Sequence, residues 1–458
     1  MSRRDGSSSS RSRGRRRAGG VLCRRGAARE RRPRVEVDLI DRLPTPWGLV
    51  RLGVAPDHPN IKAVSRAFEK IAAQPGFRFL GNVEVGRDVT HAELVELYGA
   101  VVYAFGAQTD RRLGIPGEDL PGSWPATEFV AWYNGHPDFQ DLEFDLSHER
   151  AVVIGNGNVA LDVARMLALT PEELAPTDTT EEAIAAINAA GVREILVVGR
   201  RGPVQAAWTP VEVGELGELA GADVLVDPAE LELDPGSAAE LEAAPATVKR
   251  NVEHLRGYAG RAPAGKPRAI RLRFLRSPVA ILGDDEVEAI ELVRNELVDG
   301  RAVATDDREI VECGIVFRSV GYRGVPLADI PFDETSCTVP NAGGRVLDGS
   351  GAPVPGTYCA GWIKRGPTGI IGTNKKDATE TVGLLLDDAR SGKLGPGRDA
   401  GAIDELLRGR GVAVVTQSGW EAIDAAERAA GEPYGRPRVK LSRWDALLEA
   451  ARGDAVSL

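Results

Sequence analysis

The chain has 458 residues, of which 43% are hydrophobic, and its formal net charge is −10. This length predicts two or three domains. Because no run of about 20 apolar residues occurs, we expect no insertion into a membrane. The negative net charge repels polyanions, so we also expect no binding to nucleic acid.

The cysteines and histidines bear on the cellular compartment and on metal binding. The cysteines lie far apart and form no CxxC pair, and the histidines add no metal-ligand spacing to them. This pattern is typical of reduced thiols, and it predicts a cytoplasmic protein without a metal site. The cysteines are Cys23, Cys313, Cys337 and Cys359.

The first 34 residues differ from the rest of the sequence. Residues 2–34 are rich in Arg, Ser and Gly and contain almost no apolar residue. This composition predicts neither a strand nor an amphipathic helix, and it is typical of a disordered basic tail. A transit peptide is an alternative, although the segment lacks the apolar helix face of such peptides.

Beyond this tail, apolar runs that end at turn residues predict six short strands. In chain order they are Val35–Ile40, Ala100–Phe105, Ala151–Ile154, Ile195–Val198, Gly314–Val320 and Thr357–Gly361. The Pro- and Gly-rich segment Ile115–Gly122 predicts a crossover between domains. Helical periodicity predicts helices from Asn158 to about Leu169, from Lys375 to Leu386, and in part of Trp420–Leu448.

A glycine motif directly follows the third predicted strand and opens a helix. It reads Gly155-Asn-Gly-Asn-Val-Ala160. Gly155 allows a tight turn, Gly157 lets the backbone approach a pyrophosphate, and Ala160 permits close packing. The free N–H groups and the dipole of the helix N-terminus favour negative charge at this point. The motif therefore predicts a dinucleotide site.

The end of the next strand indicates which dinucleotide binds. An NAD enzyme usually carries an acidic residue there, whereas this chain has Val198-Gly-Arg-Arg-Gly202. Arg200 and Arg201 could hold a 2′-phosphate through charge-assisted hydrogen bonds of about 1.5–3 kcal/mol each. We therefore predict NADP(H) as the ligand.

Together with these motifs, longer segments of the sequence resemble the adrenodoxin-reductase-like ferredoxin–NADP reductases of bacteria and mitochondria. The resemblance runs from about Val35 to the C-terminus. It is carried by the segments Leu43–Arg51, Gly53–Pro59, Ile154–Asp162 and Gly361–Lys376.

The resemblance implies an α/β fold with two Rossmann-like dinucleotide-binding domains. A discontinuous FAD-binding domain would comprise residues 35–114 and 320–458, with an NADP-binding domain of residues 115–319 inserted between them. Residues 1–34 would remain as an aberrant tail. The implied activity is that of an FAD-dependent reductase, which moves electrons between NADPH and a ferredoxin-type iron–sulfur protein.

The resemblance also implies roles for individual residues. Those implied for FAD are Asp41, at the adenosine ribose, and Leu49, Val85, Trp362, Gly369, Ile370 and Ile371. Those implied for NADP(H) are Arg111, Gly155, Asn156, Gly157, Asn158, Val159, Arg200, Arg201 and Glu212. His58, Glu215 and Asp162 would form a polar group beside the flavin. Judged without the resemblance, His58 is more typical of a loop histidine, and Trp362 of a core residue.

The sequence departs from the family at its beginning. Members open with a strand and a GxGxxG-type loop for the FAD pyrophosphate, and no such pattern precedes Val35. Our hypothesis is a local frameshift, because CGN arginine codons read one base later become GNN codons for Val, Ala, Gly, Asp and Glu. Read in this way, residues 11–29 can encode a strand, a glycine loop and a helix.

Three further interpretations concern the activity and the partner. The chain could be a non-catalytic NADP-binding remnant that lacks FAD, because the pyrophosphate loop is missing. It could also deliver electrons to another acceptor, such as a quinone or a partner enzyme subunit. An acidic ferredoxin would need a basic docking face, which Lys249-Arg250 and Lys266–Arg276 could supply.

Overall fold

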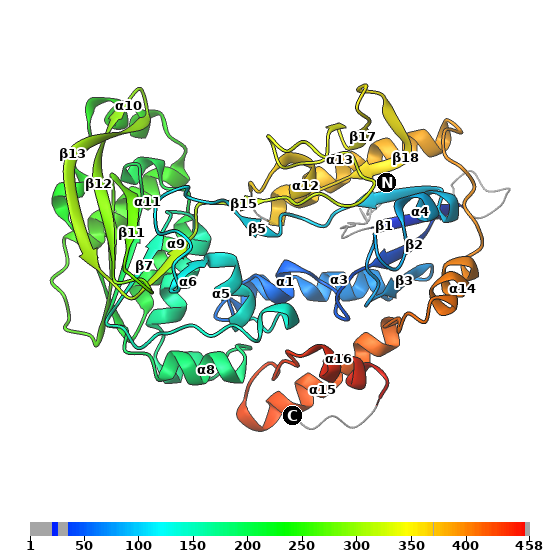
Figure 1. The fold of residues 1–458 in the computed structure, drawn as a ribbon, viewed down its shortest axis with the longest axis horizontal. Coiled ribbons are helices and arrows are strands. Elements are labelled where there is room, and N and C mark those ends of the chain that lie inside the picture. Colours follow the sequence, from blue (N-terminus) through cyan, green and yellow to red (C-terminus); the bar gives the residue numbers. More distant parts are fainter. Residues whose placement is uncertain (1–20, 26–34, 370, 454–458) are drawn as a thin grey trace, which may run out of the picture.

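The computed structural model describes residues 21–25, 35–369 and 371–453. Two sheets dominate it, and they lie side by side (Figure 1). The seven-stranded sheet has the order β16-β17-β18-β4-β1-β2-β3. Its strands are β16 (Asn341–Ala342), β17 (Arg345–Leu347), β18 (Pro353–Cys359), β4 (Ala100–Tyr103), β1 (Val21–Arg25), β2 (Val35–Ile40) and β3 (Phe77–Leu80).

Strand β1 corrects the prediction that residues 2–34 contain no strand. It lies between β2 and β4 and runs antiparallel to both, with Leu22 opposite Asp38 and Val101. In a dinucleotide-binding sheet, the first strand runs parallel to its neighbours, and its loop leaves at their carboxyl ends. Because β1 runs the other way, its own carboxyl end lies at the opposite edge of the sheet. Apart from Val21–Arg25, the residues of the frameshift hypothesis lie outside the described part of the chain.

The six-stranded sheet is entirely parallel and has the order β6-β14-β7-β8-β10-β9. Its strands are β6 (Ser123–Pro125), β14 (Ile315–Arg318), β7 (Arg150–Ile154), β8 (Glu194–Val198), β10 (Arg268–Arg273) and β9 (Ala222–Val226). The central strands read as continuous apolar runs because both of their faces are buried, as in other parallel sheets. One face packs against α6, and the other against a three-stranded antiparallel sheet. That sheet consists of β11 (Arg276–Leu282), β12 (Ala289–Val298) and β13 (Arg301–Glu312).

The chain passes between the two sheets along a short pair of strands. Strand β5 (Thr109–Asp110) leads toward the six-stranded sheet, and β15 (Tyr322–Arg323) leads back. They pair antiparallel and bridge the two halves in Figure 1. The predicted crossover Ile115–Gly122 begins just after β5, as its Pro and Gly content suggested.

Helices surround both sheets. Before residue 100 and after residue 360 they are α1 (Leu49–Leu52), α2 (Pro59–Lys62), α3 (Ser65–Ala72), α4 (His91–Leu97), α12 (Trp362–Arg365), α13 (Ile371–Arg390), α14 (Gly401–Gly409), α15 (Gln417–Gly431) and α16 (Trp444–Ala451). Between them along the chain are α5 (Ala126–Tyr133), α6 (Asn158–Ala168), α7 (Pro171–Leu174), α8 (Glu181–Asn188), α9 (Pro210–Glu215), α10 (Pro235–Ala243) and α11 (Ala246–Ala259). The predicted strands and helices are all present, with shifts of a few residues at their ends.

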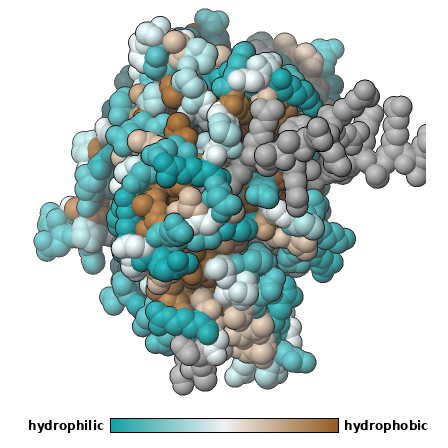
Figure 2. All heavy atoms as spheres, turned by 90° about the vertical axis from the view of Figure 1, so that its right-hand side faces the viewer, coloured by the Kyte–Doolittle hydropathy of each residue, from teal (hydrophilic) through white to brown (hydrophobic). Residues whose placement is uncertain are grey.

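The C-terminal helices α15 and α16 close the face of β2 and β3. Trp420, Ile423 and Leu447 pack there against Leu39 and Phe79. None of the described helices is long and apolar enough to cross a membrane. Figure 2 shows the end of the molecule that carries the seven-stranded sheet, where hydrophilic side chains surround smaller hydrophobic areas.

Candidate active site

The predicted nucleotide loop lies between β7 and α6. Gly155 has a φ of 140°, and a Cβ atom there would lie 2.1 Å from the carbonyl oxygen of Ser319, so only glycine fits. A Cβ atom on Gly157 would meet no atom within 4 Å. Gly157 is the N-cap of α6, and no side chain caps this helix. The loop therefore offers an open helix N-terminus to an anion.

The two asparagines connect this loop to the segment that leads into α9. The Asn158 side-chain oxygen accepts a hydrogen bond from the Thr209 N–H at 2.9 Å, and the Asn156 carbonyl accepts one from the Ala207 N–H at 2.9 Å. The side-chain nitrogen of Asn156 is buried and has no hydrogen-bond partner. The Val159 side chain is partly buried against the core.

The arginines predicted to bind the 2′-phosphate follow β8. Arg200 is exposed, and Arg201 donates one long hydrogen bond of 3.4 Å to the Gln205 carbonyl. Within the described residues, neither forms an ion pair with a carboxylate, so both guanidinium charges can meet a phosphate. Arg111 is exposed beside β15, where its side chain donates a hydrogen bond to the Tyr322 carbonyl at 3.4 Å.

A buried group of charged residues forms where α2, α6 and α9 meet. At its centre is His58, the N-cap of α2, whose side chain is 4% exposed. Its Nε2 atom lies 3.5 Å from Glu212 Oε2, 3.7 Å from Glu215 Oε2 and 3.9 Å from Asp162 Oδ1. The fold thus brings together the three residues predicted to act beside the flavin and adds Glu212. We call this group, with Asp57 and Arg165, the His58 cluster.

Sequence reasoning missed two members of the His58 cluster. Asp57 Oδ1 lies 3.5 Å from His58 Nε2. Arg165 donates to Asp57 Oδ2 at 2.6 and 3.1 Å and to Glu215 Oε2 at 2.8 Å, so it links α6 to both neighbouring segments. The spacing of three residues between Asp162 and Arg165 was a usable signal, because such residues share a helix face.

Burial and like charges raise carboxyl pKa values in the His58 cluster. Burial, the Glu212 carboxylate and the Asp57 carboxylate raise the pKa of Asp162 well above its usual range. Burial also raises the pKa of Glu212. The Tyr133 hydroxyl, whose pKa is raised by burial and by the Asp162 and Asp57 charges, is buried without a hydrogen-bond partner. The cluster therefore favours protons or other positive charge.

The residues implied for the flavin ring come from opposite ends of the chain. Trp362 begins α12 after Gly361, which has a φ of 77°, and its ring lies 5.2 Å from that of Tyr322. The indole nitrogens of Trp47 and Trp362 are buried without hydrogen-bond partners. Leu49, the first residue of α1, is 52% exposed. These features suit a surface that binds a planar polar ligand.

Of three more residues implied for FAD, two lie within the described residues near the start of α13. Gly369 has a φ of 81°, which favours glycine, and it stands two positions before the first residue of this helix. Ile371 is the first residue of α13, whereas Ile370 lies outside the described residues.

Comparisons with known proteins identify the family. No protein-family profile matches the chain. NADPH-ferredoxin reductase FprA of Mycobacterium tuberculosis is 53% identical over 429 residues, which cover 91% of this chain and 92% of that protein. Human mitochondrial NADPH:adrenodoxin oxidoreductase is 44% identical over 427 residues, with 89% and 85% of the two chains covered.

A solved structure of Mycobacterium tuberculosis FprA in complex with NADPH superimposes with a TM-score of 0.86 at 52% sequence identity. The match covers 91% of this chain and 93% of that one. The chain belongs to the adrenodoxin-reductase-like ferredoxin–NADP reductases. The two-sheet α/β architecture and the resemblance drawn from the sequence motifs agree with this membership.

Two further residues implied for FAD, Asp41 and Val85, lie beside β2 and β3. Asp41 directly follows β2, and burial raises the pKa of its carboxyl group to about 6, although it accepts a hydrogen bond from the Leu43 N–H at 2.9 Å. Val85 is half-buried against the core beside β3. The Asp41 carboxylate and the unpartnered indoles fit the ribose and ring ends of FAD. The residues before Val35 supply no reductase-type glycine sequence for its pyrophosphate.

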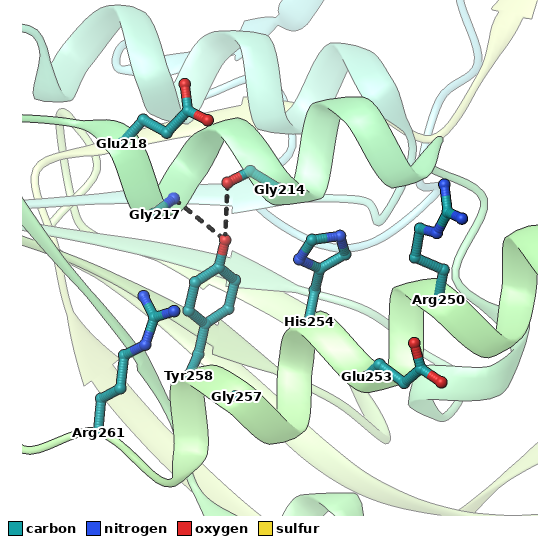
Figure 3. A pocket seen from close by; sticks show the side chains of 9 residues that line it. All are labelled: Gly214, Gly217, Glu218, Arg250, Glu253, His254, Gly257, Tyr258 and Arg261. Atoms are coloured by element: carbon teal, nitrogen blue, oxygen red, sulfur yellow. Dashed lines mark hydrogen bonds between the residues drawn. The ribbon is translucent and has the colours of Figure 1, made fainter.

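A separate cavity of about 490 Å³ lies on the other side of α9, between the 3-10 helix η3 (Leu216–Glu218) and α11. Figure 3 shows Tyr258 rising from α11, where its hydroxyl contacts the Gly214 carbonyl and the Gly217 N–H, with the His254 ring nearby. The cavity is lined by Gly214, Gly217, Glu218, Arg250, Glu253, His254, Gly257, Tyr258 and Arg261. None of the residues predicted from the reductase family lines it.

Proposed function

We propose that this chain is an FAD-dependent ferredoxin–NADP(+) reductase, which moves electrons between NADPH and a ferredoxin-type iron–sulfur protein. The observation that carries the proposal is the buried His58 cluster at the open nucleotide loop: the Asn158 side chain joins that loop to the segment that leads into α9. The names of two relatives, an NADPH-ferredoxin reductase and an NADPH:adrenodoxin oxidoreductase, support the same activity. They favour it over a remnant without FAD.

The residues of the six-stranded sheet would hold NADP(H). The α6 N-terminus at Gly157 would take the pyrophosphate, and Arg200 and Arg201 would bind the 2′-phosphate. Arg111 and Glu212 would also contact NADP(H). This assignment places the NADP-binding domain at residues 115–319, and every strand of the six-stranded sheet falls within these bounds.

The FAD-binding domain would then comprise residues 35–114 and 320–458. Asp41 would orient the adenosine ribose, and Trp362 with the backbone at Gly369 would fix the ring. When bound, FAD would supply hydride acceptance from NADPH and the release of electrons one at a time. His58, Glu215 and Asp162 would keep the place where the nicotinamide meets the flavin polar and would exclude water from it. They would also hold protons at fixed atoms.

The basic segment considered for ferredoxin docking has little free charge. Arg271 pairs with Glu194 at 2.9 Å, and Arg273 pairs with Glu230 at 2.6 Å. Arg276 pairs with a glutamate as well, at 3.1 Å. A docking face would therefore draw more on other exposed basic residues, such as Arg250. We propose a cytoplasmic location, which the free cysteines Cys313, Cys337 and Cys359 support.

The test begins with the visible absorption spectrum of the purified full-length chain. We expect bound flavin and NADPH-dependent reduction of cytochrome c that requires an added ferredoxin. Arg200→Ala and Arg201→Ala should each raise the KM for NADPH about 10- to 100-fold and leave that for NADH unchanged, since about 1.5–3 kcal/mol of binding is lost. A colourless protein that still binds NADPH would overturn the proposal in favour of the remnant.

A further inference from the structure

The His58 cluster contains more negative charge than its surroundings neutralise. Four carboxylates face a single guanidinium, that of Arg165, so the net charge is −3 when all are ionised. Buried charges of one sign are costly unless they gain a counter-charge. The carboxylates are those of Asp57, Asp162, Glu212 and Glu215.

Several buried atoms in the cluster also lack hydrogen-bond partners. They include His58 Nε2, Glu212 Oε2 and Asp57 Oδ1. The side chains of these residues are 4%, 9% and 9% exposed. The Glu212 and Asp57 oxygens each lie 3.5 Å from His58 Nε2. Buried polar atoms in proteins almost always have partners, so three such atoms close together indicate a ligand at this place.

The separations of these atoms suit a small divalent cation. Zn²⁺ lies about 2.0–2.2 Å from imidazole nitrogen and carboxylate oxygen, which places tetrahedral ligand atoms roughly 3.3–3.6 Å apart. Here His58 Nε2 lies 3.5 Å from Glu212 Oε2 and 3.7 Å from Glu215 Oε2. One atom from each residue lies within 4.8 Å of the other two.

We propose that His58, Glu212 and Glu215 form a binding site for a divalent cation of the zinc type. An imidazole ligand favours Zn²⁺ over Mg²⁺, which prefers oxygen ligands throughout. The two glutamates are three residues apart on α9 and so present their carboxylates on one side of the helix. Glu215 would share its carboxylate between the ion and Arg165.

The sequence could not predict this site, because its ligands lie more than 150 residues apart and follow no metal-binding spacing. Ion binding itself does not depend on the proposed reductase activity. One consequence does rest on that activity: an ion held by His58 and Glu215 would occupy the polar group beside the flavin. Zn²⁺ should therefore inhibit electron transfer from NADPH.

The test is isothermal titration calorimetry, in which chelator-treated, tag-free, full-length protein is titrated with Zn²⁺ and, separately, with Mg²⁺. We expect one Zn²⁺ site per chain and no comparable heat with Mg²⁺. His58→Gln should weaken Zn²⁺ binding more than about 10-fold, since even changes outside the ligand shell cost that much. Glu212→Gln gives an independent second variant, in case one of the two folds poorly.

His254→Gln is the matched control, because His254 is the histidine beside α9 on its cavity side and lies near Glu253 and Glu218. It should leave Zn²⁺ binding unchanged. The absence of a stoichiometric Zn²⁺ site in the wild-type protein would refute the proposal, as would equal binding by the wild type and both site variants. Zn²⁺ binding without inhibition of NADPH-dependent reduction would keep the site and count against the proposed role of the cluster.

Discussion

At the residue scale, the two glycines of the nucleotide loop are glycine for different reasons. Gly155 is required by the fold, because its left-handed φ and the nearby Ser319 carbonyl exclude a side chain. Gly157 has an extended backbone with nothing near its missing Cβ atom, so the fold alone does not require it. Open space above a helix N-terminus is typical of a binding site. Substituting each glycine separately distinguishes a role in folding from a role in binding.

Gly157→Ala should leave the free energy of unfolding within about 0.5 kcal/mol of the wild-type value, because the added methyl group meets no atom. It should nevertheless raise the KM for NADPH at least about 10-fold by blocking the pyrophosphate. Gly155→Ala should instead cost about 1–3 kcal/mol of stability through strain and the clash with Ser319. Urea unfolding and steady-state kinetics of both variants measure this, and similar stability losses would contradict the distinction.

At the element scale, α2 is too short to be stable alone, and the side chain at its C-terminal end fixes it. His58 is the N-cap residue but makes no side-chain capping hydrogen bond, and Lys62 ends the helix. The Lys62 ammonium donates to Asp178 at 2.8 and 3.0 Å and to Asn134 at 3.1 Å. Lys62 thus ties α2 to the half of the chain that carries α9, and so positions His58 against Glu212.

We therefore expect Lys62→Met to disturb catalysis through the position of His58. The variant keeps the apolar stem but loses three hydrogen bonds, and we expect a loss of about 1–3 kcal/mol in stability. It should lower kcat/KM for NADPH about 10-fold, because small misplacements near the reacting groups are costly. Lys70→Met in α3 is the control, since Lys70 is exposed and forms no ion pair among the described residues. Equal kinetics of the two variants would argue against the positioning role.

At the scale of the whole molecule, the C-terminal segment joins the two halves of the chain through buried charges. Lys440 pairs with Asp178 at 3.2 Å and donates hydrogen bonds to the Arg51 carbonyl and to Asn134, each at 3.2 Å. Arg436 donates to the carbonyls of residues 177 and 179. The sequence pattern predicts only partial helix in this segment, yet the segment fixes how the halves meet.

Asp178→Asn should therefore be strongly destabilising, because it leaves two buried ammonium groups, those of Lys62 and Lys440, without a counter-charge. We expect a loss of about 3–5 kcal/mol in the free energy of unfolding. Asp387→Asn, which breaks an exposed pair with Arg390, should cost about 0–1 kcal/mol. Urea unfolding at neutral pH compares them, and a small effect at Asp178 would show that these charges do not hold the halves together.

The Asp178 carboxylate should also make the stability of the protein depend on pH. Despite its burial, the Lys440 and Lys62 charges lower the pKa of Asp178 below its usual value. A lowered pKa in the folded state gives stability that is present above the unfolded pKa of about 3.9 and is lost as the pH falls below it. The free energy of unfolding, measured between pH 5 and pH 2, should fall less steeply for Asp178→Asn than for the wild type, and a parallel fall of both would assign the acid sensitivity to other groups.

The sequence by itself determined whatever depends on neighbours along the chain. The strands, the Gly155–Ala160 loop with its helix and the arginine pair are local patterns, because backbone geometry and helix dipoles act over a few residues. Family motifs added the expected grouping of His58, Asp162 and Glu215.

Only the tertiary structure decided what depends on distant segments. It set the antiparallel direction of β1, added Asp57 and Arg165 to the His58 cluster, and buried Lys440 against Asp178. Burial and Coulomb interactions depend on distance in space, and residues far apart in a sequence carry no local signal of that distance.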